Sequence, residues 1–327
     1  MTRKGILDKF LSTGQDQDLP IIDAHMHYWD LEENYHPWLC EKPLIPFRYG
    51  DYTAICTSFM PNDYKQLLDN HLVLDTVYME AEWHPSQGLD EVKWIHSLHQ
   101  ASGQPVGMIA QAWLNEEDIE DYLSSIATYP LVRGIRHKPA WCELNNYRKE
   151  HTLPGSMNCP HWEKGYALLA KHNLLFELQT PWWHLPDLIH LLEKYPDTTV
   201  VINHAGVPGD REPETLKGWY DNLRVISEYP NVFIKVSGIG EQNHPWTLER
   251  NGQLIRSIIL LFGTSRVMFA SNFPVDSLCV DYKTLFDCFK TITSDFSEQE
   301  KLNMFYLNAT NIYKTNKQPT KREKETQ

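Results

Sequence analysis

The sequence has few of the features that mark membrane or secreted proteins. It holds no apolar run of about 18 residues, the length that a membrane-spanning helix needs. Its first 20 residues lack the apolar core of a signal peptide. The six cysteines are scattered without a CxxC pair, whereas a disulfide framework would be denser and a zinc knuckle clustered. We therefore expect a cytoplasmic protein with reduced thiols.

Basic residues are in the minority, which excludes several classes of partner. Lys and Arg number 30 against 43 Asp and Glu, a formal net charge of −13 at pH 7. Binding to nucleic-acid backbones or anionic membranes needs a basic surface. The phosphate-binding patterns GxxxxGK[ST] and GxGxxG are also absent. The sequence therefore predicts a small-molecule substrate, predicts neither nucleic acid nor membrane as partner, and leaves a homo-oligomer open.

The order of apolar segments predicts an α/β fold. Hydrophobic residues make up 42% of the 327 residues and charged residues 22%, a composition typical of a globular protein. Short β-branched runs alternate with stretches of helical spacing, as in a single (β/α)₈ TIM barrel. The expected strands are residues 20–27, 74–83, 105–114, 131–137, 174–180, 199–206, 231–238 and 266–274.

No break in composition divides the chain into two folded domains. We predict an N-terminal extension over residues 1–17, a barrel over 18–314 and a disordered basic tail over 315–327. Two connections are unusually long, residues 28–70 after the first strand and 138–162 after the fourth. Since both leave the carboxyl ends of barrel strands, both are expected to overhang the active-site face.

The clearest local motif lies at the end of the first strand. Side chains alternate along a strand, so Asp23, His25 and His27 share one face. Two histidines spaced in this way can bind one metal ion from the same side. Two structural histidines are the alternative, because a chain with 15 His contains HxH by chance quite easily.

Five segments, in barrel order, together resemble one enzyme family. The HxH motif ends the first strand, and residues 131–137, 200–206, 233–238 and 266–276 fall on the fourth, sixth, seventh and eighth. This set resembles the amidohydrolase superfamily, and within it the amidohydrolase-2 family and its branch of sugar-lactone and pyrone-dicarboxylate lactonases. The resemblance covers about residues 18–314.

The resemblance implies roles for individual residues. It assigns His25 and His27 to a divalent metal or to substrate oxygen, and His204 to the metal or the scissile carbonyl. Glu177 matches an acidic position of this branch and is a fourth candidate metal ligand, whereas Arg136 matches a residue that pairs with a substrate carboxylate or carbonyl. One divalent ion, zinc or manganese, is the implied cofactor. A metal-free site stays open, because lactones are activated acyl compounds.

One position departs from the family pattern. Asn272 stands where many relatives carry the aspartate that acts as general base, and an amide cannot take a proton from water. We predict that Asn272 orients substrate or water and that a nearby carboxylate is the base, Asp276 first and Glu80 second. In the alternatives, Asp276 caps the next turn and Glu80 is a buried hydrogen-bond partner of a loop.

Taken together, these residues predict a hydrolase that opens a lactone or related cyclic ester to a hydroxy acid. An acyl transfer of this kind needs a polarised carbonyl, an activated water and a partner for the carboxylate formed. Non-oxidative decarboxylation on the same barrel, or a binding protein that has lost catalysis, are the alternatives. The candidate catalytic residues are His25, His27, His204, Asn272 and Asp276; the candidate substrate-binding residues are Arg136, His137, Glu80, Trp182, Trp183 and Lys235.

Overall fold

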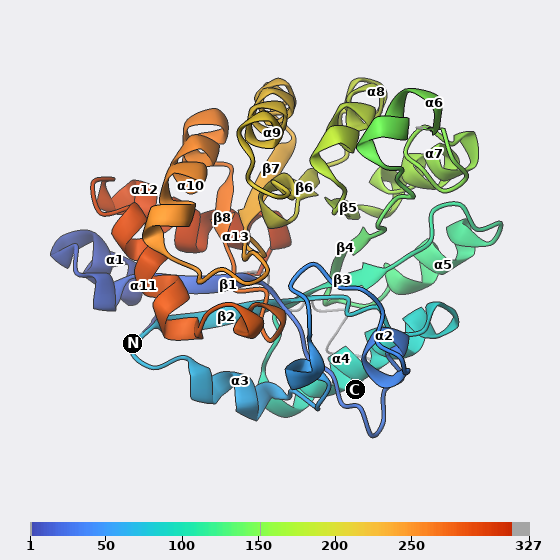
Figure 1. Cartoon of the computed structure of the whole chain (residues 1–327). Helices are drawn as coiled ribbons and strands as arrows, with labels where there is room; N and C mark the ends of the chain where they lie inside the picture. The colour runs from blue at the N-terminus through green and yellow to red at the C-terminus, as the bar shows by residue number, and fades with distance from the viewer. Residues whose placement is uncertain (1, 151, 316–327) are drawn as a thin grey trace.

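Eight parallel strands form the centre of the molecule (Figure 1). In the computed structural model, which describes residues 2–150 and 152–315, they pair in chain order from first to last. The strands are β1 (Pro20–Met26), β2 (Leu72–Met79), β3 (Gly107–Gln111), β4 (Val132–Arg136), β5 (Leu175–Leu178), β6 (Val200–Ile202), β7 (Val232–Val236) and β8 (Val267–Phe269).

Two backbone hydrogen bonds link the last strand to the first. The N–H of Asn272 donates to the carbonyl of His25 at 2.7 Å, and the N–H of His27 donates to the carbonyl of Phe273 at 2.8 Å. Both lie at the carboxyl ends of β1 and β8, so the barrel is nearly closed at this end. The fold is the predicted TIM barrel.

Helices surround the strands, as Figure 1 shows. Within the described residues, none of them is both long enough and apolar enough to cross a membrane. The α-helices are α1 (Arg3–Thr13), α2 (Pro37–Cys40), α3 (Pro61–Leu67), α4 (Gly88–Ser102), α5 (Ile119–Ile126), α6 (Tyr147–Glu150), α7 (Pro160–Ala167), α8 (Ile189–Lys194), α9 (Pro213–Ile226), α10 (Leu248–Phe262), α11 (Tyr282–Ile292), α12 (Glu298–Leu302) and α13 (Asn308–Tyr313).

Some of the helices around the barrel have an apolar face that is buried and, at their N-termini, residues that cap the free backbone N–H groups. In α10, the Thr247 hydroxyl accepts the N–H of Arg250, and the apolar stripe that includes Ile255 and Ile258 is fully buried. In α12, Ser297 and Glu300 form a capping box. Of these two helices, α10 packs on β7 and β8, whereas α12 packs on α1 and on residues Asn303–Leu307.

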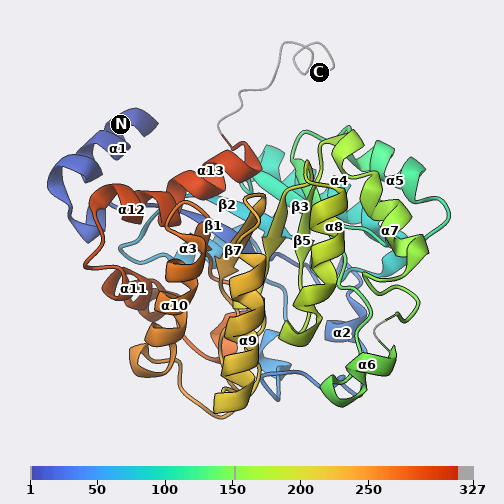
Figure 2. The ribbon, with the colours of Figure 1, turned by 90° about the horizontal axis from the view of Figure 1, so that it is seen from above.

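The long connections after β1 and β4 lie at one end of the barrel. Figure 2 shows α2, in the first connection, and α6, in the second, at the end opposite α13. This is the end at which the strands finish, so both connections surround the barrel mouth.

The N-terminal segment is helical and packs on the other end. Phe10 of α1 is fully buried, and Arg3 pairs with the carboxylate of Asp75. The predicted disordered tail lies, from residue 316 on, outside the described residues.

Several strands end earlier than predicted, because the backbone turns at their carboxyl ends. β2 was expected to reach residue 83, β6 residue 206 and β8 residue 274, but they end at Met79, Ile202 and Phe269. Beyond these ends, Glu82, His204 and Asn272 have positive φ values of 54°, 50° and 58°. Left-handed backbone in residues other than glycine is strained, and such strain concentrates at functional sites.

Candidate active site

Three histidines from opposite sides of the barrel meet at its mouth. His25 is the last residue but one of β1, His27 directly follows the end of that strand, and His204 begins the short turn after β6. The ring centre of His25 lies 5.1 Å from that of His27 and 4.7 Å from that of His204. All three are buried. The structure therefore brings the predicted histidines together.

Burial keeps these imidazoles neutral. It lowers the pKa of His27 to about 3, with the nearby charge of Arg136 as the second cause. Burial also lowers the pKa values of His25 and His204 well below the usual range, assisted in His204 by the charge of Arg48. Neutral imidazoles have a free lone pair, so they can accept a proton, polarise a bound group through N–H, or bind a metal.

Hydrogen bonds fix the orientation of His27. Its Nδ1–H donates to the carbonyl of Met79 at 2.9 Å, which leaves a lone pair on Nε2. This Nε2 lies 3.2 Å from Oδ1 of Asn272, whose Nδ2–H donates to Asp276. Two acceptor atoms thus face each other, an arrangement that a proton or a metal cation on Nε2 would stabilise.

The two ring nitrogens of His25, Nδ1 and Nε2, have no hydrogen-bond partner among the described residues, although the side chain is fully buried. Buried polar atoms normally have a partner. With the side chains as they stand, no group of three or more His, Cys, Asp or Glu within residues 2–150 and 152–315 is placed to hold a metal ion. The imidazole donors nevertheless suit a zinc-type ion, because a neutral His25 has one free lone pair and no bonding partner among the described residues.

Glu177 and Lys235 pair with each other inside the barrel. Lys235 Nζ donates to Glu177 at 2.9 Å, the Tyr313 hydroxyl donates to the same oxygen at 2.6 Å, and Asn203 bonds the other oxygen. Both charged side chains are fully buried. Burial lowers the pKa of Lys235 to about 8, against the attraction of Glu177. The predicted metal ligand Glu177 and the predicted substrate-binding residue Lys235 are thus engaged with protein groups.

Asp276 lies behind Asn272 and is held by three donors. Its carboxylate accepts the Nδ2–H of Asn272 at 2.7 Å, the hydroxyl of Tyr49 at 3.1 Å and the N–H of Gly238 at 3.0 Å. Burial raises its pKa to about 6, and the charge of Arg48 limits the rise. The side chain does not cap the following turn; in that region Asp281 caps α11 instead.

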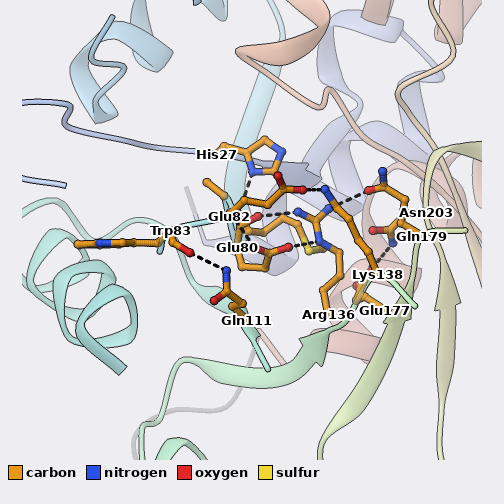
Figure 3. A network of polar contacts seen from close by, with 12 residues as sticks. His27, Glu80, Glu82, Trp83, Gln111, Arg136, Lys138, Glu177, Gln179 and Asn203 are labelled. Carbon is orange, nitrogen blue, oxygen red and sulfur yellow. Dashed lines mark hydrogen bonds and ion pairs between the residues drawn. The ribbon is translucent and has the colours of Figure 1, made fainter. Parts of the chain in front are cut away.

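Arg136 and Glu80 form a buried pair at the ends of β4 and β2, shown in Figure 3. Arg136 donates through Nε to the Glu80 carboxylate, through Nη2 to the Glu80 carbonyl at 2.7 Å, and through Nη1 to Gln179 at 3.3 Å. Burial disfavours the ionised form of Glu80, but Arg136 outweighs it and the pKa of Glu80 is lowered. Glu80 also accepts the N–H of Glu82 at 2.8 Å. Glu80 therefore holds a loop and neutralises Arg136.

Two cations that the sequence did not single out reach the mouth. Lys138 follows β4 and forms an ion pair with Glu82 (Figure 3). Arg48 comes from the long connection after β1; among the described residues no hydrogen-bond or ion-pair acceptor is found for its guanidinium, which lies over the ring of Tyr49 at 4.7 Å. No periodicity marks Arg48 in the sequence. Its only signal was its place in a connection expected to overhang the site.

The mouth contains two adjoining cavities. The histidine cavity, lined by His27, His204, Asn272 and Arg48, has a volume of about 270 Å³. The tryptophan cavity, lined by Trp38, Trp83 and Trp113, has a volume of about 340 Å³. The residues that line both are Trp38, Ile45, Glu82, Arg136 and Lys138.

The remaining predicted substrate contacts divide between these cavities and the outer helices. His137 lines the tryptophan cavity. Trp182 packs against α9, where a Cβ added at Gly218 would come within 2.5 Å of its ring. Trp183 donates its indole N–H to the carbonyl of Cys142 at 2.8 Å. Within the described part of the chain, the linings of the two cavities include neither Trp182 nor Trp183.

Comparison with known proteins finds relatives along most of the chain. The amidohydrolase family pattern matches residues 22–315. An uncharacterized protein, y4mH of Sinorhizobium fredii, is 33% identical over 297 residues, which cover 91% of this chain and 99% of that protein. L-fucono-1,5-lactonase of Burkholderia ambifaria is 26% identical over 79% of this chain and 81% of its own. A crystal structure of a Burkholderia multivorans amidohydrolase with bound zinc superimposes with a TM-score of 0.73 at 19% identity, covering 90% of this chain and 99% of that one.

Proposed function

The chain belongs to the amidohydrolase family, and from this premise we propose that it hydrolyses a lactone, or a related cyclic ester, to a hydroxy acid. The names of two relatives, an L-fucono-1,5-lactonase and an L-rhamnono-gamma-lactonase of Scheffersomyces stipitis, support this class of reaction. Polar sugar lactones and carboxylated ring lactones are the substrates that the charged mouth suits.

One observation carries the proposal: a cation without a hydrogen-bond or ion-pair acceptor among the described residues shares a cavity with neutral imidazoles. Arg48 lines the histidine cavity together with His27 and His204. Ring opening of a lactone places negative charge on the carbonyl oxygen and then leaves a carboxylate. A guanidinium binds such oxygens through a planar fork of N–H donors. Arg48 takes this role better than Arg136, because Glu80 already neutralises Arg136.

Asn272 and Asp276 position and deprotonate the attacking water. Asp276 accepts the Asn272 amide, and this bond holds Oδ1 of Asn272 at the cavity. A carboxyl with a pKa of about 6 is largely ionised at neutral pH and still basic enough to accept a proton. Water adds to the carbonyl carbon and gives one proton to the Asp276 carboxylate. The ring C–O bond then breaks, and the ring oxygen takes up that proton and leaves as a hydroxyl group.

His25, His27 and His204 would hold a single divalent ion. Zinc and manganese are named in structures of similar fold, a zinc-bound amidohydrolase and a manganese-bound decarboxylase. When bound, such an ion supplies Lewis-acid polarisation and lowers the pKa of coordinated water. The chain's own part is to keep the three imidazoles neutral by burial, which is the state that binds metal.

Acid release from a panel of sugar and carboxylated ring lactones, followed with a pH indicator, tests this function. We expect the purified protein to open at least one of them. His25→Ala should abolish turnover and lower the metal content while leaving the melting temperature within a few degrees, since this imidazole makes no hydrogen bond to the rest of the described chain. A wild-type protein inactive on the whole panel, or a fully active His25→Ala, would contradict the proposal.

A further inference from the structure

The tryptophan cavity is separated from the histidine cavity by an ion pair. Lys138 and Glu82, which pair with each other, line both. A ligand with its reacting ring beside His27 and His204 can therefore extend past this pair. Ligand pockets typically have volumes of about 300–1,000 Å³, and the two cavities together, at about 270 and 340 Å³, fall in this range.

The three indoles present carbon surface to the tryptophan cavity. Each N–H is already used within the protein: Trp38 donates to the carbonyl of Ala81 at 3.0 Å, Trp83 to Gln87 at 3.1 Å and Trp113 to Gln111 at 3.3 Å. Trp113 is nevertheless 38% exposed. A large aromatic side chain left exposed at the edge of a cavity is typical of a binding surface.

The charged and polar groups of this cavity are also paired with one another. Glu80 pairs with Arg136 and Glu82 with Lys138, and Tyr35 donates to Glu41. A second sugar would need free donors and acceptors for its hydroxyl groups, and these pairs leave few. The cavity therefore favours a flat apolar group.

His137 supplies one free donor. Its Nδ1 accepts two hydrogen bonds, from the indole N–H of Trp162 at 2.9 Å and from the backbone N–H of Leu114 at 3.1 Å. The ring is neutral, because burial lowers its pKa to about 4, so the remaining proton is on Nε2. No acceptor for that proton is found in the described residues, and His137 lines the cavity.

We propose that the tryptophan cavity binds an aromatic ring bearing an oxygen acceptor, attached to the lactone that is opened in the histidine cavity. The aromatic ring stacks on Trp113 and its oxygen accepts from His137. This inference rests on the proposed function for the position of the lactone. The substrate is then an aryl-substituted lactone.

Binding of 3-(4-methoxyphenyl)propionate and of propionate, measured by calorimetry, tests the cavity without turnover. We expect the wild type to bind the aryl acid at least about 10-fold more tightly than propionate, from burial of the ring. Trp113→Ala should remove most of this preference, and Trp113→Phe should retain it. Trp141→Ala is the matched control, because Trp141 is 48% exposed and belongs to neither cavity lining among the described residues; its preference should equal that of the wild type.

Equal binding of both acids by the wild type, or equal effects of Trp113→Ala and Trp141→Ala, would overturn the inference. The lactone panel, extended with aryl-substituted lactones, separates it from the proposed function. An aryl preference without any lactone hydrolysis supports the cavity and overturns the function. Hydrolysis without an aryl preference supports the function and overturns the cavity.

Discussion

In the proposed reaction, Asn272 positions the attacking water and Asp276 accepts its proton. The amide of Asn272 lines the histidine cavity, and the carboxylate of Asp276 lies directly behind it. An amide cannot act as a base. Because its Nδ2–H donates to the Asp276 carboxylate, Asn272 is held in a fixed orientation and can position a water molecule in the cavity. Asn also tolerates its left-handed φ of 58° better than most residues.

The pKa of Asp276 sets the expected pH profile. Its pKa is raised from 3.8 to about 6, so the carboxylate that accepts from Asn272 and Tyr49 is lost as pH falls through 6. We expect kcat/KM to rise with pH up to about 6 and then level off. Asp276→Asn should abolish the rise of kcat/KM below pH 6. It should also reduce kcat by roughly 10²–10⁴-fold, the usual contribution of a positioned base. The exposed Asp197→Asn is the control; an unchanged profile in Asp276→Asn would exclude Asp276 as the base.

Arg48 offers a second test at a single residue. Loss of a charge-assisted hydrogen bond to the substrate costs about 1.5–3 kcal/mol, so Arg48→Ala should lower kcat/KM by roughly 10–150-fold. The melting temperature should not change, because Arg48 is exposed. Arg224→Ala on the outer surface of α9 serves as control. Equal kinetics for the two variants would remove Arg48 from the site.

The sequence predicted the residues that end strands better than those that lie in loops. His25, His27 and His204 follow apolar runs at regular positions, and the structure brings them together. Arg48 lies 21 positions after His27 in an irregular connection, where no period predicts the direction of a side chain. The Glu80–Arg136 pair joins the ends of β2 and β4, which are separated by β3, and no local pattern in the sequence predicts a contact across an intervening strand.

At the scale of elements, the sequence located the strands but not their ends. The predicted strands ran past Ile202 and Phe269 to residues 206 and 274, whereas the left-handed residues His204 and Asn272 lie beyond the observed strand ends. The register between β1 and β2 also shifts between Asp23 and Met26, at the HxH motif. Such irregularities redirect side chains without leaving a periodic signal.

The helix α1 gives a prediction about stability alone. It packs at the barrel end opposite α2 and α6, and its Phe10 is fully buried. Phe10→Ala should lower the free energy of unfolding by about 3–5 kcal/mol, the cost of a cavity of this size. Leu11→Ala, at a neighbouring position that is 42% exposed, should cost far less. Urea unfolding measures both, and kcat/KM should stay at the wild-type value; a fall in activity of the folded Phe10→Ala protein would contradict this separation.

At the scale of the whole molecule, one buried acid makes stability depend on pH. Glu91 of α4 is fully buried; one oxygen accepts from Tyr78 and from the N–H of Ala81, and the other has no partner in the described residues. Burial, and then the charge of Glu80, raise its pKa from 4.5 to about 8. Its contribution to stability is therefore complete below pH 4.5 and is lost as pH rises through 8.

The substitution Glu91→Gln keeps the size and shape of the side chain but replaces the carboxyl group with an amide that cannot ionise. Between pH 6 and pH 8.5 the wild type should lose about 2 kcal/mol more unfolding free energy than Glu91→Gln, from the linkage of about 1.36 kcal/mol per pKa unit. Urea titrations at the two pH values measure the difference. Glu33→Gln, at an exposed position, should behave as the wild type. Parallel losses in wild type and Glu91→Gln would show that Glu91 is ionised in the folded protein.

The fold was predictable from the sequence because it depends on the hydrophobic pattern of many residues together and not on any single one. Eight apolar segments in alternation determine a barrel even when each boundary is wrong by several positions. The site depends instead on a few contacts between distant segments, such as Asn272 with His27 and Tyr49 with Asp276. The first joins residues 245 positions apart and the second residues 227 positions apart, so no local pattern predicts them.

The most direct test of the account is hydrolysis in water labelled with heavy oxygen, with mass spectrometry of the product. For any lactone that the wild type opens, we predict a hydroxy acid with one heavy oxygen in its carboxylate. The same lactone should remain closed with a folded His204→Ala variant. Release of carbon dioxide from a carboxylated ring compound without ring opening, or equal product from wild type and variant, would contradict lactone hydrolysis in the histidine cavity.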